Sequence, residues 1–231
     1  MSKTESRTEE VENSAARRIL DDPVSRRKFM ALTGGTASLS VLIAACGDDD
    51  DESTSTSSDT TSSAPSDDAL AQFGEGDLGI VNYALTLEYL EAAFYAEVAA
   101  SGLFKGADLA LIEEFGKNEA EHVTALTSTV KTLGGKPAPM PKTQFDLTDA
   151  AVVLQTAADV ENLGAAAYLG QAAAIESPDV LAAALSIHTV EARHAAALNT
   201  LTDQPITPDG AFAAPADAQT VLDSVQPFIV S

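Results

Sequence analysis

The sequence predicts an all-α fold: a four-helix bundle of two antiparallel hairpins joined by a long crossover. Aromatic residues make up only 5% of the 231 residues and Trp is absent, a composition that suits close-packed helices better than a β-sandwich. From residue 73 onward, apolar residues recur with the helical period. The connections between these helical stretches are short, long and short in turn, as in a bundle with one crossover.

Four long helices are predicted from capping residues at their starts and from glycines or irregular segments at their ends. A short fifth helix is predicted around 216–225, within a Pro-containing tail of residues 206–231. The long helices are predicted over 77–101, capped by Asp77; 108–133, capped by Asp108; 148–175, capped by Thr148; and 177–201, with Ser177 as the cap and Pro178 in the first turn.

The lengths of the connections decide how these helices are arranged. About six residues join the first two helices and about two join the last two, so each pair must form an antiparallel hairpin. The segment 134–147 has three prolines and no apolar period. Its residues, at ~3.3 Å each, can run the full length of a bundle. We therefore expect one bundle domain over residues 73–205.

The first 45 residues are predicted to be an export signal. Ser25, Arg26, Arg27, Lys28 and Phe29 fit the twin-arginine pattern, so Arg26 and Arg27 are the residues expected to engage the twin-arginine export machinery. An uncharged run follows that is shorter than the ~20 residues of a transmembrane helix.

The signal ends in a motif that resembles a bacterial lipobox, which would make Cys46 the lipidated first residue of the mature chain. Residues 46–72 continue as a predicted disordered, acidic tether, because 11 of the 14 residues 53–66 are Ser or Thr. We expect an exported protein, anchored by this lipid to the outer face of the cell membrane or to the periplasmic side of a membrane.

The charge of the chain excludes some classes of partner. Thirty-five acidic and 13 basic residues give a net charge of -22, which would repel a phosphate backbone, so no nucleic-acid partner is expected. One cysteine excludes a disulfide framework and a four-Cys zinc site. The acidity fits a high-salt environment and an ordinary acidic secreted protein equally well.

Two Glu-x-x-His motifs provide the main chemical signal. Glu119 and His122 lie on the second predicted helix, and Glu191 and His194 on the fourth. Residues three apart share a helix face, so each motif can offer a carboxylate and an imidazole to one metal ion. One such motif is common by chance, but two, each on the second helix of its hairpin, are strong evidence for a metal site.

The first helix of each hairpin adds a further pair of residues. Glu88 is followed seven residues later by Tyr95, and Glu161 by Tyr168, so each Tyr returns to the face of its Glu after two turns. Each half of the bundle therefore carries Glu, Tyr and Glu-x-x-His, as in a duplicated hairpin. All of these carboxylates and imidazoles lie near the middle of their helices and can converge in a bundle.

This pattern resembles the ferritin-like superfamily, and most closely its secreted ferritin-like domain proteins, over about residues 75–202. The resemblance implies a centre of two Fe ions, or alternatively two Mn ions, with Tyr95 and Tyr168 donating hydrogen bonds to its ligands. The implied ligands are Glu88 and Glu161 at the two ends, Glu119 and Glu191 bridging the metals, and His122 and His194 on one metal each.

The resemblance also implies a range of activities. Ferroxidase, peroxide removal and di-manganese catalase-like activity all fit, with O₂ or peroxide as the small-molecule partner, and the spacing does not choose among them. The alternative is a non-enzymatic, surface-anchored metal-binding or stress-associated bundle. A homo-oligomer is left open, although a lipid anchor on every subunit disfavours a closed storage cage.

Three residues beside the predicted ligands are given other roles. His188, one turn before Glu191, is expected in the core or in support of a ligand. Glu91, one turn after Glu88, is expected to be solvated or to pair helices rather than to bind metal. Glu121 is expected to face solvent, because it is ~200° around the helix from Glu119.

Overall fold

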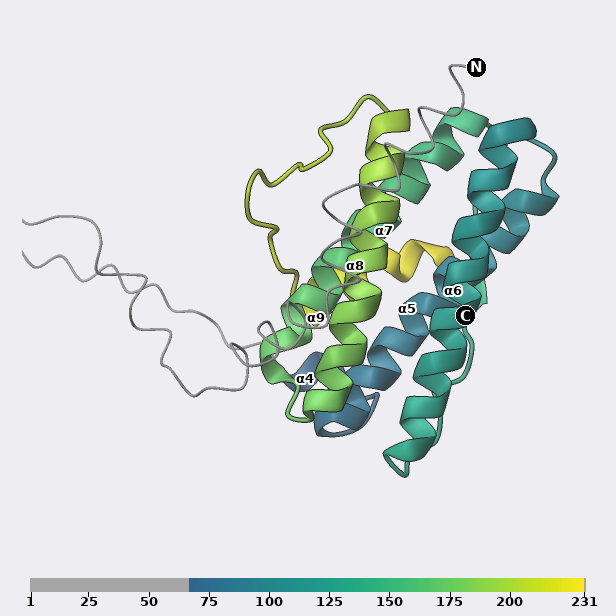
Figure 1. Ribbon diagram of the computed structural model, residues 1–231. Coiled ribbons are helices and arrows are strands. Elements are labelled where there is room, and N and C mark those ends of the chain that lie inside the picture. Colours follow the sequence, from purple (N-terminus) through teal and green to yellow (C-terminus); the bar gives the residue numbers. More distant parts are fainter. Residues whose placement is uncertain (1–66, 231) are drawn as a thin grey trace, which may run out of the picture. The chain divides into compact units, whose positions relative to one another are not determined.

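The computed structural model describes residues 67–230, which form the helical bundle shown in Figure 1. The predicted all-α fold class is confirmed. The elements in chain order are α4 (Asp67–Leu70), α5 (Gly76–Ala100), α6 (Gly106–Thr132), β1 (Lys142–Thr143), α7 (Ala150–Gln171), the 3₁₀ helix η2 (Ala172–Ala174), α8 (Pro178–Leu201), α9 (Ala218–Val225), the 3₁₀ helix η3 (Gln226–Phe228) and β2 (Ile229–Val230).

The four long helices pair as the connection lengths predict. Helix α5 packs along α6 and α7 packs along α8, and these two hairpins meet through contacts of α5 with α7 and of α6 with α8. Within residues 67–230, no helix combines the length and the apolar character that crossing a membrane requires.

The caps of the long helices differ in part from prediction. Ser177 caps α8 as expected, its side chain accepting a hydrogen bond from the N–H of Val180. Helix α7 is capped by Asp149 rather than Thr148, because the Asp149 carboxylate accepts from the first N–H groups of the helix. Asp108 lies inside the first turn of α6, which begins at Gly106.

Asp77 is not the cap of α5 but a link between the two hairpins. Helix α5 begins at Gly76, whose φ of +54° is a conformation that favours glycine, and this places Asp77 within the first turn. Its carboxylate oxygens accept hydrogen bonds of 2.8 Å from the N–H groups of Glu176 and Ser177, just before α8. The start of α5 therefore also stabilises the start of α8.

The crossover and the C-terminal segment are tied to each other and to the bundle. Strand β1 in the crossover pairs antiparallel with β2, with Lys142 opposite Val230 and Thr143 opposite Ile229. The short helix predicted in the tail is present as α9, and it buries Ala218, Val221 and Val225 against α5 and α7. The crossover thus contains a strand that its lack of an apolar period did not predict.

The predicted tether ends earlier than residue 72. Residues 67–70 form helix α4, and Ala69 is buried against α5 and α9. Its apolar neighbours Leu70 and Phe73 pack in the same cluster, which explains why this stretch is ordered.

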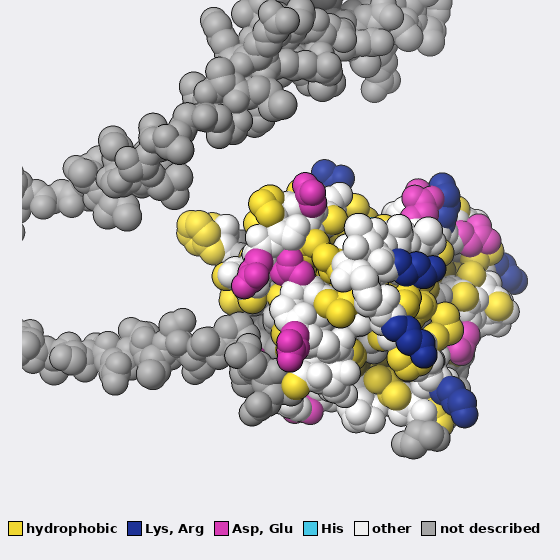
Figure 2. All heavy atoms as spheres, turned by 90° about the horizontal axis from the view of Figure 1, so that it is seen from below, with side chains coloured by type: hydrophobic (Ala, Val, Ile, Leu, Met, Phe, Trp, Pro, Cys, Tyr) yellow, Lys and Arg dark blue, Asp and Glu magenta, His cyan; other side chains and the backbone are white. Residues whose placement is uncertain are grey.

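The apolar core is interrupted at mid-height by a buried polar layer. Along α5, Val81 and Leu85 belong to one apolar cluster, Phe94 and Val98 belong to another, and Glu88 lies between them. On the face in Figure 2, acidic and basic side chains are scattered among apolar and neutral ones and form no single large patch. Inside the bundle, by contrast, Glu88, Glu91, Glu119, Glu161 and Glu191 are all buried.

Candidate metal centre

All six predicted ligand side chains converge at the middle of the bundle, one or two from each long helix. The four carboxylates have no exposed surface, and the residues His122 and His194 are 9% and 3% exposed. Burying so many ionisable groups is very unfavourable unless their charges are compensated. The side chains are Glu88 from α5, Glu119 and His122 from α6, Glu161 from α7, and Glu191 and His194 from α8.

These side chains form two adjacent sets that share two carboxylates. In each set, one ligand atom per residue lies within 4.8 Å of those of the others, and Glu119 and Glu191 belong to both sets. The first set is Glu88, Glu119, His122 and Glu191, and the second is Glu119, Glu161, Glu191 and His194.

Glu119 spans the two sets with its two oxygens. Its Oε2 is 2.9 Å from Nδ1 of His122, and its Oε1 is 3.0 Å from Nδ1 of His194. Both imidazoles therefore present the same nitrogen, Nδ1, to the centre. A carboxylate placed in this way can contact two cations at once.

Several of these close contacts are not hydrogen bonds. Nδ1 of His194 lies 3.0 Å from Oε1 of Glu119 and 3.2 Å from Oε2 of Glu161, yet all three atoms lack a hydrogen-bond partner. Both carboxylate oxygens of Glu191 lack one as well. Donor atoms that are buried, close and not aligned on one another are the arrangement expected of ligands directed at a common ion.

The ionisation of the centre is strongly perturbed. Burial raises the pKa of Glu88 well above its usual range and that of Glu191 to about 8. Burial would also raise the pKa of Glu119, but its contacts with the two imidazoles outweigh burial and lower it to about 2. Against the opposing effect of burial, the surrounding carboxylates raise the pKa of His122 to about 12 and of His194 to about 10. Without a cation, protons on Glu88, Glu191 and the two imidazoles therefore offset part of the negative charge of the centre.

Each tyrosine binds the carboxylate of the opposite hairpin. The hydroxyl of Tyr95 on α5 donates to Oε1 of Glu161 at 2.5 Å, and that of Tyr168 on α7 donates to Oε1 of Glu88 at 2.6 Å. Burial raises the pKa of both hydroxyls well above the usual value, so they remain donors. Each carboxylate keeps its Oε2 for the centre, within 3.2 Å of a histidine Nδ1.

A comparison with known families agrees with this geometry. The family model described as "ferritin-like domain" matches residues 76–204, which is more than half of the chain. The chain belongs to the ferritin-like domain family. No curated protein matches it.

Among solved structures, a conserved hypothetical protein from Mycobacterium tuberculosis is similar to this ferritin-like chain, with a TM-score of 0.51 and 21% sequence identity. The match covers 55% of this chain and 98% of that one. At this level of identity the likeness shows the fold alone.

Glu91 of the ferritin-like domain is buried, so of the two expected roles, solvated or pairing helices, the solvated one is wrong. It is 2% exposed and lies beside Glu191 on the side of the centre covered by α9. Gly164 on α7 makes room for both, because a Cβ there would lie 2.9 Å from Oε1 of Glu91 and 3.0 Å from Oε2 of Glu191. The signal was visible in the sequence: Gly164 occupies, in the second hairpin, the position that Glu91 has in the first.

His188 was expected in the core or in support of a ligand, and within residues 67–230 it makes no hydrogen bond to any of the six ligands. Its half-buried ring places Nδ1 3.0 Å from the carbonyl oxygen of Ala165, to which an Nδ1–H can donate. It lines a cavity of about 320 Å³ between the α7/α8 hairpin and residues 206–214, outside the ligand cluster. Glu121 is exposed, as expected.

Two groups beside His194 were missed from the sequence. The ring of Phe115 stacks on the imidazole with centroids 4.0 Å apart, and the amide nitrogen Nδ2 of Asn118 lies 3.0 Å from Nε2. Both residues precede Glu119 on α6, at positions that identify no partner without the fold.

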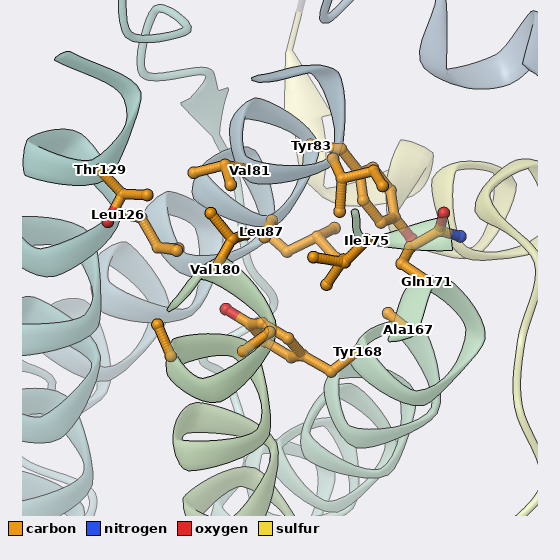
Figure 3. Close-up of a pocket in the computed structure, with 14 residues that line it drawn as sticks. Val81, Tyr83, Leu87, Leu126, Thr129, Ala167, Tyr168, Gln171, Ile175 and Val180 are labelled. Atoms are coloured by element: carbon orange, nitrogen blue, oxygen red, sulfur yellow. The ribbon is translucent and has the colours of Figure 1, made fainter. Parts of the chain in front are cut away.

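A small apolar cavity lies toward one end of the ferritin-like bundle, and none of the six ligand residues lines it. It has a volume of about 30 Å³ and lies between the starts of α5 and α8 and the ends of α6 and α7 (Figure 3). Tyr168 lines it with its ring while its hydroxyl binds Glu88.

Residues Arg26, Arg27 and Cys46, predicted for export and lipidation, lie outside the described residues.

Proposed function

We propose that this ferritin-like protein binds two metal ions, iron first and manganese as the alternative, and uses them to oxidise Fe(II) or to consume O₂ or peroxide. The observation that carries the proposal is the pair of four-residue sets that share Glu119 and Glu191. A shared pair of carboxylates fits two cations better than one.

The residues present fit such a centre. Four carboxylates and two imidazoles supply oxygen and nitrogen donors, which suit iron or manganese, whereas no thiolate lies among them. Two divalent cations would carry four positive charges, equal to the charge of the four ionised carboxylates. They would also give partners to the buried atoms of Glu119, Glu161, Glu191 and His194 that lack hydrogen bonds.

When bound, two ferrous ions supply two electrons to one oxidant molecule. The chain's own part is to orient the ligands and to exclude water. Tyr95 and Tyr168 each hold one oxygen of a terminal carboxylate, so that its second oxygen faces the centre. The carboxylate side chains are fully buried, whereas the side chain of His122 is 11% exposed and that of His194 is 4% exposed. Among the ligands, His122 is therefore the most accessible to a small oxidant from solvent.

The decisive experiment is a titration of the purified protein with Fe(II) without oxygen, followed by exposure to O₂. The proposal expects two ions per chain and oxygen uptake that depends on them. Two bound ions without oxygen or peroxide consumption would favour the non-enzymatic metal-binding bundle. A chain that binds neither Fe(II) nor Mn(II) would refute the metal centre itself.

We also propose that the protein is exported by the twin-arginine route and held at the outer face of the membrane by a lipid on Cys46. The Arg26-Arg27 signal and the lipobox support this proposal. Cys46→Ser should release the protein from the membrane fraction or leave the signal uncleaved. Lysine at both Arg26 and Arg27 should block export, and unchanged export of that variant would refute the twin-arginine route.

A further inference from the structure

His194 is held from three directions, whereas its counterpart His122 is not. Nδ1 of His194 faces Glu119 and Glu161, Phe115 stacks on the ring, and the amide nitrogen Nδ2 of Asn118 lies 3.0 Å from Nε2. Within residues 67–230, no hydrogen bond reaches Nε2 of His122. The side chain of His122 is 11% exposed and that of His194 is 4% exposed.

The difference follows from the sequence of the two hairpins. Asn118 stands immediately before Glu119, and the equivalent residue before Glu191 is Val190, which has no polar side-chain atom. The position of Phe115, four residues before Glu119, corresponds to Ile187. An amide and an aromatic ring are therefore available to one imidazole only.

We infer that Asn118 is a positioning residue, which fixes the ring of His194 so that the metal position of Glu161 and His194 binds its ion more tightly than that of Glu88 and His122. This inference rests on the proposed metal centre and makes its two positions unequal. A ligand that is already oriented loses less conformational freedom on binding than one that is free to turn.

The chemistry of the imidazole explains why an amide suits this place. A metal ion on Nδ1 requires that nitrogen to be unprotonated, so the proton of the neutral ring is on Nε2. A side-chain amide can turn by 180° and present either its NH₂ or its carbonyl oxygen. In the structure the amide nitrogen Nδ2 of Asn118 faces Nε2. When the amide turns by 180° to place its oxygen there, Asn118 accepts the Nε2–H and fixes the tautomer that the metal needs.

The test is a calorimetric titration of the metal-free protein with Co(II). For the wild-type chain we expect two binding steps, of which His194→Ala removes the tighter and His122→Ala the weaker. Asn118→Leu should weaken the tighter step by ~10-fold or more, a usual loss when a group that orients a ligand is removed. Asn118→Asp keeps an acceptor for Nε2–H and should preserve or strengthen that step.

Val190→Ala is the matched control, because it changes the equivalent residue of the other hairpin without removing a hydrogen bond. It should leave both steps unchanged. In Zn(II)-loaded protein, nitrogen-15 spectra of the imidazoles should show an Nε2–H on His194 that exchanges slowly in the wild type and fast in Asn118→Leu.

The inference is overturned if Asn118→Leu weakens both steps equally or neither, or if Asn118→Asp loses the tighter step. Should Asn118→Leu not fold, Asn118→Asp decides alone: the inference expects it to keep the two steps unequal, and equal steps would refute it. Failure of the proposed function is recognised separately, because the wild-type chain would then bind no Co(II) at all.

Discussion

The two hairpins, α5/α6 and α7/α8, are alike in the residues that face the centre and unlike in the residues behind them. Each supplies Glu, Tyr and Glu-x-x-His, and each Tyr binds the Glu of the other hairpin. Behind these groups, the first hairpin has Asn118 and Glu91 where the second has Val190 and Gly164. The donor set is thus close to symmetric, and the surroundings that set its electrostatics are not.

The largest expected effect is the loss of a shared carboxylate. Glu119→Ala or Glu191→Ala removes a ligand from both metal positions, so each should reduce the bound metal from about two ions per chain to well below one. Metal analysis after Fe(II) loading measures this effect. If the hairpins are equivalent in this respect, the two variants will lose metal to a similar extent.

The controls for this prediction lie on the same helices. Glu121→Ala removes an exposed carboxylate of α6 and should keep the full metal content. Glu88→Ala removes a ligand from one set only and should leave about one ion per chain. Equal losses in Glu88→Ala and Glu119→Ala would contradict the assignment of Glu119 as a shared ligand.

Metal removal should destabilise the bundle, and more so at high pH. A metal present at ~100 times its Kd adds about 2.7 kcal/mol to the free energy of unfolding, roughly 5–10 °C in Tm for a domain of this size. Thermal melts with and without chelator at pH 8 and pH 5 measure the difference. We expect the metal-free protein to melt higher at pH 5 than at pH 8, and the loaded protein to lose its advantage at pH 5.

The sign follows from the carboxylates and imidazoles of the centre. The pKa of Glu191 is raised to about 8 in the fold, so its ionisation destabilises the metal-free protein progressively above the usual value of 4.5. The raised pKa values of His122 and His194 stabilise the fold fully below 6.5 and progressively less above it. Both contributions favour the metal-free fold as pH falls from 8 to 5. A metal-free protein that is more stable at pH 8 would show that other groups dominate.

The tyrosines give a smaller effect that should be equal in the two hairpins. Tyr95→Phe and Tyr168→Phe each remove one buried hydroxyl that donates to a carboxylate, which should cost ~1.5–3 kcal/mol in the free energy of unfolding. Denaturant unfolding of the metal-loaded variants measures it. Tyr89→Phe is the control, since no hydrogen bond of the Tyr89 hydroxyl occurs in residues 67–230, and a loss of the same size there would refute the assignment.

The smallest effect concerns the pair of positions where the hairpins differ most. Gly164→Ala places a Cβ within 3.0 Å of two flexible carboxylates and should cost ~1 kcal/mol. In a Glu91→Ala background, the same change should cost less, because only the contact with Glu191 remains and alanine favours a helix more than glycine does. A double-mutant cycle of unfolding free energies measures the difference, and additive effects would show that Glu91 and Gly164 do not share space.

The sequence was sufficient to predict the helix pairing and the convergence of six side chains, because spacing, caps and connection lengths are local properties. The same reasoning failed for Asp77, whose partners Glu176 and Ser177 lie about 100 residues away in the chain. In the sequence, a carboxylate in the first turn of a helix has the same pattern as a cap, whether it binds its own helix or another.

The packing of other residues around the centre could not be predicted from the sequence either. Glu91 was expected to be solvated or to pair helices, and it is buried. The outcome depends on Gly164, which faces it from α7, and on α9, which covers this side of the bundle. Burial of this kind is decided by packing between distant elements, and no local pattern records it.

The Glu91 side chain occupies the space that a side chain at position 164 would need, and this pairing bears on how the bundle could have arisen. A symmetric dimer of one helical hairpin would already form the reciprocal Tyr–Glu contacts and both shared carboxylates, with the crossover needed only as a covalent link. In such a dimer, however, position 91 and position 164 would hold the same residue. Two glutamates would compete for one space, and two glycines would leave it empty. A glutamate opposite a glycine is possible only after the two copies are free to diverge, so this pair marks a feature that belongs to the fused chain and not to its halves.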